Sequence, residues 1–273
     1  MQTPEDETSP MPSGLWERFK SLPTDSMANT VIVTIILCLF CSMVVSGFAI
    51  SLRPLQEANK LLDKRKNILQ VAGLYDDGTD IDEVFKSIES RVVDLQAGKF
   101  TDAVDPDLYD QRTAAKDPTQ SIELTEDLAG IRRQAKLASV YLVRDSGGEI
   151  EKIILPVHGY GLWSTLYGFV AVNREGDLVE ALQFYEHAET PGLGAEVDNP
   201  SWRAQWPGKR IYDESGNVKL GINKTVPTGG ADYHIDALAG ATLTTRGVDN
   251  LVKFWMGEQG FKPFLENLKK GAA

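Results

Sequence analysis

The sequence predicts an α+β protein in which a single N-terminal transmembrane helix is followed by a soluble domain of antiparallel strands with flanking helices. First, Thr30–Ile50 contains no charged residue, and as a helix it would span roughly 30 Å, the thickness of the hydrocarbon core of a membrane. Second, apolar stretches between residues 139 and 185 are separated by Gly- and Asp-rich turns, which is typical of β-hairpins. Third, helical patterns at 245–257 and 262–270 close the chain, and strands followed by segregated helices define this class.

Composition limits what the soluble part can bind. The formal net charge of the 273 residues is −11, which argues against nucleic acid as a partner because phosphate backbones require a basic surface. The only two cysteines, Cys38 and Cys41, lie inside the apolar run, so no disulfide framework is expected. We predict no metal site there, since a closed site needs further ligands.

We expect four segments: a cytoplasmic leader (1–28), a transmembrane helix (29–52), a helical membrane-proximal segment (53–130) and the main folded domain (131–273). A cleaved signal peptide is the alternative to an anchor, but Leu52-Arg53-Pro54 is not a small-residue cleavage site. Basic residues are more numerous after the apolar run than before it. Counted alone, they would place the C-terminal side in the cytoplasm.

The remaining elements follow from periodicity. Amphipathic patterns predict helices over 54–72 and 81–95, a polar stretch with prolines predicts a loop over 98–120, and a short helical stretch runs from Thr125 to Arg133. Strands are expected at 139–143 and 150–157 around the turn 145–148, and at 166–172 and 178–185 around the turn 173–177. A further hairpin is expected across 213–217.

The stretch Asp236–Val248 joins a small-residue turn to a cluster of threonines and the start of a helix. Gly240 and Ala241 allow a bulky group to approach the backbone closely. Thr244 or Thr245 is expected to cap the helix. A helix N-terminus beside three threonine hydroxyls suits a phosphate group, although a capped helix without a ligand would show the same pattern.

Two loops offer surfaces for a heteroaromatic ring. Gly161, Leu162 and Trp163 form a flexible apolar loop on which a flat ring can stack, unless Trp163 belongs to the core. In the second loop, Glu189 and Thr190 precede a turn at Pro191, Gly192 and Leu193, which is either a rigid turn or a clamp on a polar ring edge. Lys224 is a candidate ion-pair partner for a phosphate. His187 and Glu189 lack a third ligand, so no metal is predicted.

The pattern Asp236-x-x-x-Gly240-Ala241-Thr242-x-Thr244 resembles the flavinylation motif of FMN-binding domains in bacterial respiratory complexes. The resemblance implies that a flavin transferase links FMN to Thr242 as a phosphoester and recognises Asp236. The family usually has Ser or Thr where this chain has Ala239, and the residues alone leave Thr244 and Thr245 open as acceptors. Both loops above also match the family. The stretch Phe254–Phe264 resembles the C-subunit family of sodium-translocating NADH:quinone oxidoreductases.

The resemblance implies an electron-transfer subunit with no catalytic residue and no NADH site of its own, anchored in the bacterial inner membrane with the flavin domain on the periplasmic side. Its partners would be the other subunits of a membrane respiratory complex and, during maturation, the flavin transferase. Two alternatives stay open: the flavin subunit of the related ferredoxin-linked complex, and a cofactor-free membrane-anchored assembly module. A hydrolase is not indicated, since no Gly-x-Ser-x-Gly is present. The expected FMN-binding residues are Thr242 (covalent), Asp236, Gly240, Ala241, Thr244, Thr245, Gly161, Leu162, Trp163, Glu189, Thr190, Gly192, Leu193 and Lys224.

Overall fold

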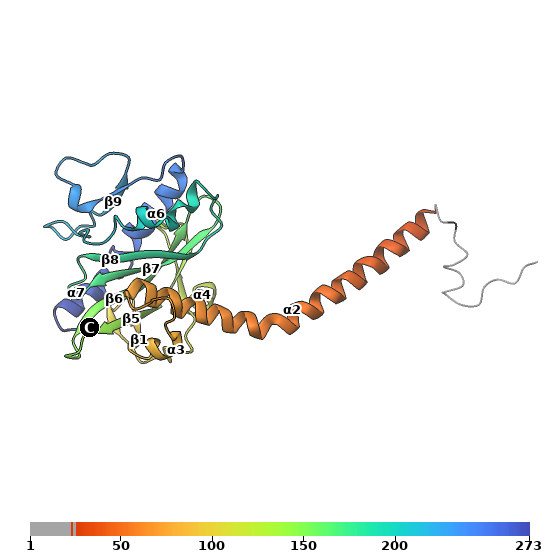
Figure 1. The fold of residues 1–273 in the computed structure, drawn as a ribbon, viewed down its shortest axis with the longest axis horizontal. Helices are drawn as coiled ribbons and strands as arrows, with labels where there is room; N and C mark the ends of the chain where they lie inside the picture. The colour runs from red at the N-terminus through yellow and green to blue at the C-terminus, as the bar shows by residue number, and fades with distance from the viewer. Residues whose placement is uncertain (1–22, 24–25) are drawn as a thin grey trace, which may run out of the picture. The chain divides into compact units, whose positions relative to one another are not determined.

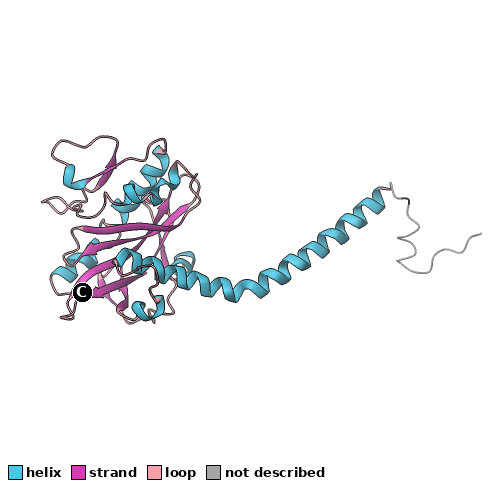
Figure 2. Cartoon of the chain, in the orientation of Figure 1, coloured by secondary structure: helices cyan, strands magenta, loops and turns pink. Residues whose placement is uncertain are grey.

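The computed structural model describes Pro23 and residues 26–273 (Figures 1 and 2). Most of the expected leader, residues 1–28, lies outside the described residues. The chain divides into two compact units, Met1–Lys60 and Leu61–Ala273.

Among the described residues the first helix is α2 (Met27–Ala72), which carries the apolar run predicted to cross a membrane. In the described part of the chain it is the one helix long and apolar enough to do so, and none of its apolar window is buried. Side chains such as Phe40, Met43 and Phe48 are more than half exposed. A continuous apolar surface of this length suits lipid and not water.

The second unit is built on a six-stranded antiparallel sheet with the strand order β2-β1-β5-β6-β7-β8. Its strands are β1 (Ile88–Asp94), β2 (Lys99–Phe100), β5 (Leu137–Arg144), β6 (Ile150–Tyr160), β7 (Thr165–Asn173) and β8 (Val179–Glu186). Two small sheets accompany it. β3 (Ser121–Glu123) pairs antiparallel with β4 (Arg133–Ala135), and β9 (Gly221–Asn223) pairs parallel with β10 (His234–Asp236).

Helices cover both faces of the large sheet. The helices of this unit are α3 (Ile81–Phe85), α4 (Gln111–Lys116), α5 (Pro200–Arg203), α6 (Thr242–Trp255) and α7 (Lys262–Lys269), with 3-10 turns η1 (Gly194–Asp198) and η2 (Ala231–Tyr233). Successive residues of a strand face opposite sides. In β6, Leu155 therefore joins the core formed with Trp255 of α6, whereas Ile154 packs in a second core with Ile68 and Leu69 at the end of α2.

The fold class predicted from the sequence is confirmed, and the predicted strands of β5 to β8 and the helices α6 and α7 are present. The hairpin expected across 213–217 is reduced to a turn with one bridge, Tyr212 to Val218.

Three predictions for the region before β5 are wrong. The helix expected over 81–95 ends at Phe85 and is followed by strand β1. Val92 and Val93 are both buried because β1 lies between two strands and is covered on both faces, which removes the alternation that identifies a strand. The loop expected at 98–120 contains β2 and α4, and the helical stretch expected from Thr125 is a turn leading into β4. The segment 53–130 is thus only partly helical.

Candidate functional site

Three segments distant in sequence meet at the carboxylate of Glu189, which is only 5% exposed. Its Oε1 accepts hydrogen bonds from the backbone N–H of Leu162 and of Trp163, both at 3.0 Å, at the tip of the β6–β7 hairpin. Its Oε2 accepts one from the hydroxyl of Thr244 in α6 at 2.6 Å. The loop after β8, the hairpin tip and the first turn of α6 are therefore joined by one side chain.

These hydrogen bonds decide the charge of Glu189. Burial alone would raise the pKa of its carboxyl, but the hydrogen bonds from the Thr244 hydroxyl and the hairpin amides lower it below its usual value. Hydrogen bonds to a charged form favour that form. Glu189 is therefore a buried anion whose hydrogen bonds lie within the protein. A direct contact between Glu189 and FMN stays a prediction.

Hydrogen bonds and a tight turn fix the conformation of the loop after β8. The His187 Nδ1 accepts from the Glu189 N–H at 3.2 Å, so its Nε2–H donates to Asp198 at 2.8 Å. Gly192 has a φ of +74°, and the Leu193 N–H donates to the Thr190 carbonyl at 3.1 Å, as in a turn with glycine at its third position. The predicted turn at Pro191 and Gly192 is thereby confirmed.

The same loop holds the indole of Trp163, whose Nε1–H donates to the Thr190 hydroxyl at 3.1 Å. The side chain of Trp163 is 65% exposed, so it does not belong to the core. Each of the three segments joined at Glu189 also exposes a leucine: Leu162, Leu193 and Leu243. Exposed apolar side chains on segments that meet in this way suit a flat ring.

Glycines allow these segments to approach one another closely. A Cβ on Gly161 would lie 2.5 Å from the Glu189 Oε1, and one on Gly194 would lie 2.6 Å from the Thr244 Oγ1. A Cβ on Gly247 of α6 would lie 2.5 Å from the carbonyl oxygen of Tyr160. Sequence reasoning missed Gly194 and Gly247. A glycine inside a helical pattern, as at 247, is the signal that could have revealed the close approach.

The acceptor stretch differs from the prediction at its cap. Helix α6 begins at Thr242 and follows Ala241, with no side-chain cap, so the expectation that Thr244 or Thr245 caps the helix is wrong. Both hydroxyls are engaged elsewhere, because Thr244 bonds to Glu189 and Thr245 accepts from the Leu238 N–H at 3.2 Å. Thr242 is exposed, and its hydroxyl forms no hydrogen bond with any described residue.

The backbone before Thr242 brings the remaining candidates near the same stretch. Gly240 has a φ of +73°, and a Cβ on it would lie 3.1 Å from a methyl of Leu193. Asp236 ends β10, is exposed and accepts from the His234 Nε2 at 2.9 Å. Lys224 directly follows β9, the parallel partner of β10, and makes no ion pair with any described residue.

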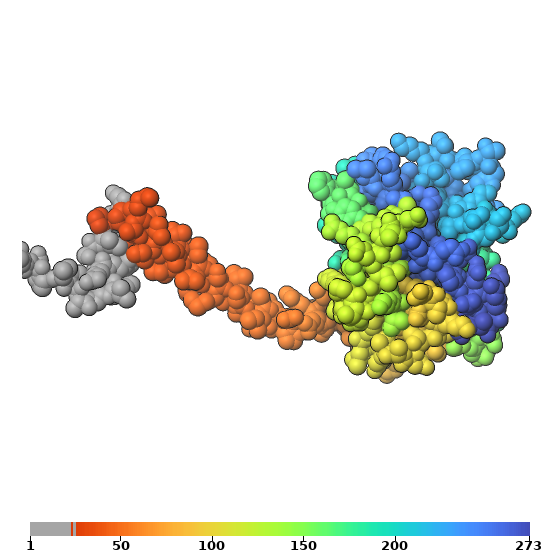
Figure 3. All heavy atoms as spheres, turned by 180° about the vertical axis from the view of Figure 1, so that it is seen from behind, coloured from red at the N-terminus to blue at the C-terminus, as the bar shows by residue number. Residues whose placement is uncertain are grey.

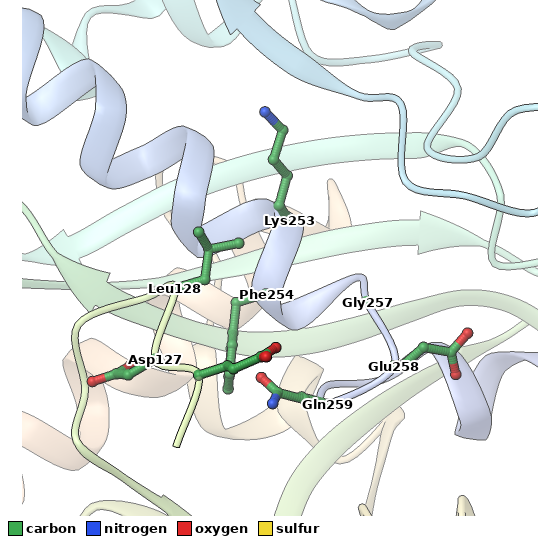
Figure 4. Close-up of a pocket in the computed structure, with 8 residues that line it drawn as sticks. Asp127, Leu128, Lys253, Phe254, Gly257, Glu258 and Gln259 are labelled. Carbon is green, nitrogen blue, oxygen red and sulfur yellow. The ribbon is translucent and has the colours of Figure 1, made fainter. Parts of the chain in front are cut away.

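A hollow of about 440 Å³ beside the end of α6 is a poor competitor for this role (Figure 4). Its charged groups do not converge: Lys253 points away from Asp127 and Glu258 in Figure 4 and pairs with Asp249 at 2.6 Å. Asp127 accepts from two backbone N–H groups of its own loop. Among the residues that the structure describes, no group of three or more potential metal ligands is found.

Residues 161–257, which contain all the segments joined at Glu189, match the FMN-binding domain family, so this part of the chain is an FMN-binding domain. The chain is 46% identical to the C-subunit of the Na(+)-translocating NADH-quinone reductase of Yersinia pestis, covering 91% of this chain and 95% of that protein. It is 48% identical to the same subunit of Pseudomonas aeruginosa, covering 91% and 98%. The chain belongs to the C-subunit family of Na(+)-translocating NADH-quinone reductases.

Solved structures agree with this assignment. The crystal structure of Shewanella oneidensis NqrC superposes with a TM-score of 0.72 at 33% identity, covering 78% of this chain and 99% of that one. The corresponding C-subunit of Parabacteroides distasonis gives a TM-score of 0.62 at 26% identity, covering 78% and 96%. The resemblance drawn from the sequence motifs is confirmed, and α2 anchors a subunit of a membrane complex.

Proposed function

We propose that this chain carries FMN as a phosphoester on the Oγ1 of Thr242 and relays electrons between other redox centres of a Na(+)-translocating NADH:quinone reductase. When bound, FMN supplies the electron-carrying ring, and the protein supplies attachment, a stacking surface and the electrostatic environment. The chain itself needs no NADH site, because the substrates would bind on other subunits.

The observation that carries the proposal is the state of the three threonine hydroxyls at the start of α6. Thr244 and Thr245 are 0% and 7% exposed and their hydroxyls are already hydrogen-bonded. Thr242 is exposed and its hydroxyl has no partner in the described chain. A transferase that must bring a phosphate to a hydroxyl therefore finds Thr242 accessible and its two neighbours occupied.

The surroundings of Thr242 suit a phosphate group. Thr242 is the first residue of a 14-residue helix, whose first N–H groups lack intrahelical acceptors and whose dipole favours an anion. Lys224, which directly follows β9, forms no ion pair with any described residue. We propose that it pairs with the phosphate.

The ring would lie on the apolar surface of Leu162, Trp163, Leu193 and Leu243. Trp163 is held by Thr190, and its loop is held by Glu189. The indole of Trp163 is therefore preorganised before any ligand binds. Because a phosphoester leaves the ring unmodified, these side chains would set the environment of its redox chemistry.

We propose that the sheet domain faces the periplasm and that a flavin transferase modifies it there, with Asp236 as a recognition residue. Protease accessibility in intact spheroplasts tests the sidedness, since a periplasmic domain is degraded without lysis. Protection until lysis would place the domain in the cytoplasm and contradict the proposal.

Flavin attachment is tested by in-gel fluorescence of the denatured chain after coexpression with a flavin transferase. We expect fluorescence in the wild type, none in Thr242→Ala, and unchanged fluorescence in Thr228→Ala, an exposed threonine of the same domain. Absence of fluorescence in the wild type, or its persistence in Thr242→Ala, would overturn the assignment. Circular dichroism of both variants checks that the fold is retained.

A further inference from the structure

A second hollow of about 630 Å³ lies between α4, the loop before β4 and the ends of β6 and β7. Its lining contains four cationic side chains and no Asp or Glu: Arg112, Lys116, Arg132 and Arg133. The whole chain has a net charge of −11, yet every charged residue that lines this hollow is cationic. Figure 3 shows the yellow-green segment that supplies these residues beside the green end of the β6–β7 hairpin.

The fold brings these charges together from separate elements. Arg112 and Lys116 lie four residues apart on α4 and therefore share a helix face. Arg132 and Arg133 come from the loop that enters β4. Opposite them, two cross-strand pairs of β6 and β7 form the remaining wall: His158 with Tyr167, and Tyr160 with Thr165.

Two of the four cations have no counter-charge in the described chain. Arg112 pairs with Glu186 at 2.7 Å. The Arg133 guanidinium donates to the hydroxyl and the carbonyl of Ser121, at 2.9 and 3.2 Å, and lies 3.7 Å from the exposed carboxylate of Glu123. Neither Lys116 nor Arg132 forms an ion pair with a described residue. Like charges gathered in a concavity repel one another and raise the local concentration of anions.

Arg132 is held in this position against its backbone preference. It is the one non-glycine residue in the described chain with a positive φ, at 63°. The Arg133 N–H donates to the Ile131 carbonyl at 2.7 Å, and both Asp127 carboxylate oxygens accept from the loop's N–H groups. A left-handed non-glycine residue is strained by about 1 kcal/mol, and such strain concentrates at functional sites. A glycine in place of Arg132 would relieve this backbone strain but would remove the positive charge.

The aromatic wall is rigid and partly open. The Arg112 guanidinium lies 3.4 Å from the centroid of the Tyr167 ring, and the His158 ring stacks on Tyr167 with the two centroids 5.5 Å apart. Burial and Arg112 lower the pKa of His158 to about 4, so the imidazole is neutral at pH 7. Tyr160 is half exposed and offers an apolar surface beside the cations.

We propose that this pocket binds a phosphate group carried on a larger body, with the oxygens facing Lys116 and Arg132 and the body covering Tyr160. Guanidinium groups match phosphate oxygens in bidentate geometry. The phosphate belongs either to a soluble molecule or to a phospholipid headgroup. The proposal does not depend on FMN at Thr242, because no lining residue is a candidate flavin ligand.

The test uses the full chain in a nonionic detergent at low salt, with two probes measured by isothermal titration calorimetry. Pyrophosphate represents a soluble phosphate, and dihexanoyl phosphatidic acid below its micellar concentration represents a headgroup, with dihexanoyl phosphatidylcholine as its zwitterionic control. We expect binding of at least one anionic probe, with an affinity that falls as salt increases. Binding of pyrophosphate identifies a soluble source, and binding of phosphatidic acid alone identifies a lipid source.

Three variants locate the binding. Arg132→Gly and Lys116→Gln should each lower the affinity for the anionic probe about tenfold. Lys99→Gln, which removes an exposed charge on β2, should leave that affinity unchanged. Because Arg132→Gly also relieves strain, it should unfold at the same temperature as the wild type or higher, so lost binding cannot be attributed to misfolding. All affinities should be the same in a Thr242→Ala background. The proposal would be overturned if neither anionic probe bound, or if all three variants bound the probe with the affinity of the wild type.

Discussion

Neutralising Glu189 is the sharpest perturbation of the candidate site, because Glu189→Gln changes its charge with almost no change in volume. The carboxylate accepts three short hydrogen bonds: two from hairpin amides at 3.0 Å and one from Thr244 at 2.6 Å. In the variant one oxygen can still serve the amides, but an NH₂ group faces the Thr244 hydroxyl, which must then reorient to accept.

The expected loss is worked from these three bonds. Hydrogen bonds to a charged group contribute about 1.5–3 kcal/mol and neutral ones about 0.5–1.5 kcal/mol, so neutralisation removes about 1 kcal/mol per bond. The variant also avoids burying a charge, which offsets part of the sum. We expect a net destabilisation of about 2 kcal/mol. For a domain of this size that lowers Tm by about 4–8 °C.

The assay is thermal unfolding of the full chain in detergent, followed by near-UV circular dichroism, with Glu180→Gln on β8 as a matched exposed control. The folded-state pKa of Glu189 is lowered, so its stabilisation is present above the unfolded pKa and is lost as the pH falls through the folded pKa. The gap between wild type and variant should therefore close at acidic pH. A Tm within about 1 °C of the wild type at pH 7, where 1 kcal/mol corresponds to about 2–4 °C, would refute the reasoning.

Two further predictions concern stability. The pKa of His158 is lowered from 6.5 to about 4, so the unfolded chain binds a proton that the folded chain does not, and stability should fall by up to about 3 kcal/mol as the pH drops through this window. His158→Phe should reduce this slope in urea unfolding between pH 7 and 4.5, and an unchanged slope would contradict the assignment. Gly247→Ala should destabilise by about 1–3 kcal/mol, because its Cβ would meet the backbone of Tyr160 and Gly161. Gly221→Ala, whose closest contact is a side chain at 3.3 Å, should lower Tm less, and equal losses would argue against the close approach.

Local sequence patterns were sufficient where strands are joined by short turns. The hairpins β5–β6 and β7–β8 each have apolar stretches around a Gly-containing turn, and the helical spacing of Val248, Leu251 and Val252 marks α6. Strand β1 could not be recognised in the same way, since burial of both its faces removes alternation. Its partner β5 lies more than forty residues later, a pairing that no local pattern encodes.

The candidate site was only partly predictable for a related reason. The motif resemblance located Thr242 and the two loops, but the hydrogen bond between Glu189 and Thr244 joins residues 55 positions apart. That contact and the hydrogen bond from Leu238 to Thr245 distinguish Thr242 from its two neighbours, which the residue pattern alone leaves equivalent. Arg132 and Arg133, interpreted from sequence as the end of a helix, become part of a pocket only when α4 brings Arg112 and Lys116 beside them.

The hydrogen bond between Thr244 and Glu189 also has a consequence for the order of events in biosynthesis. Before the domain folds, Thr242, Thr244 and Thr245 are three equivalent alcohols on a flexible chain, and nothing in their local chemistry favours one of them. After folding, two of them are hydrogen-bonded and buried, while the third stands free at the start of α6 within the described chain. Site-selective attachment of a cofactor at Thr242 would therefore require a finished fold, and the presence of that cofactor on a chain would record that the fold had been completed first.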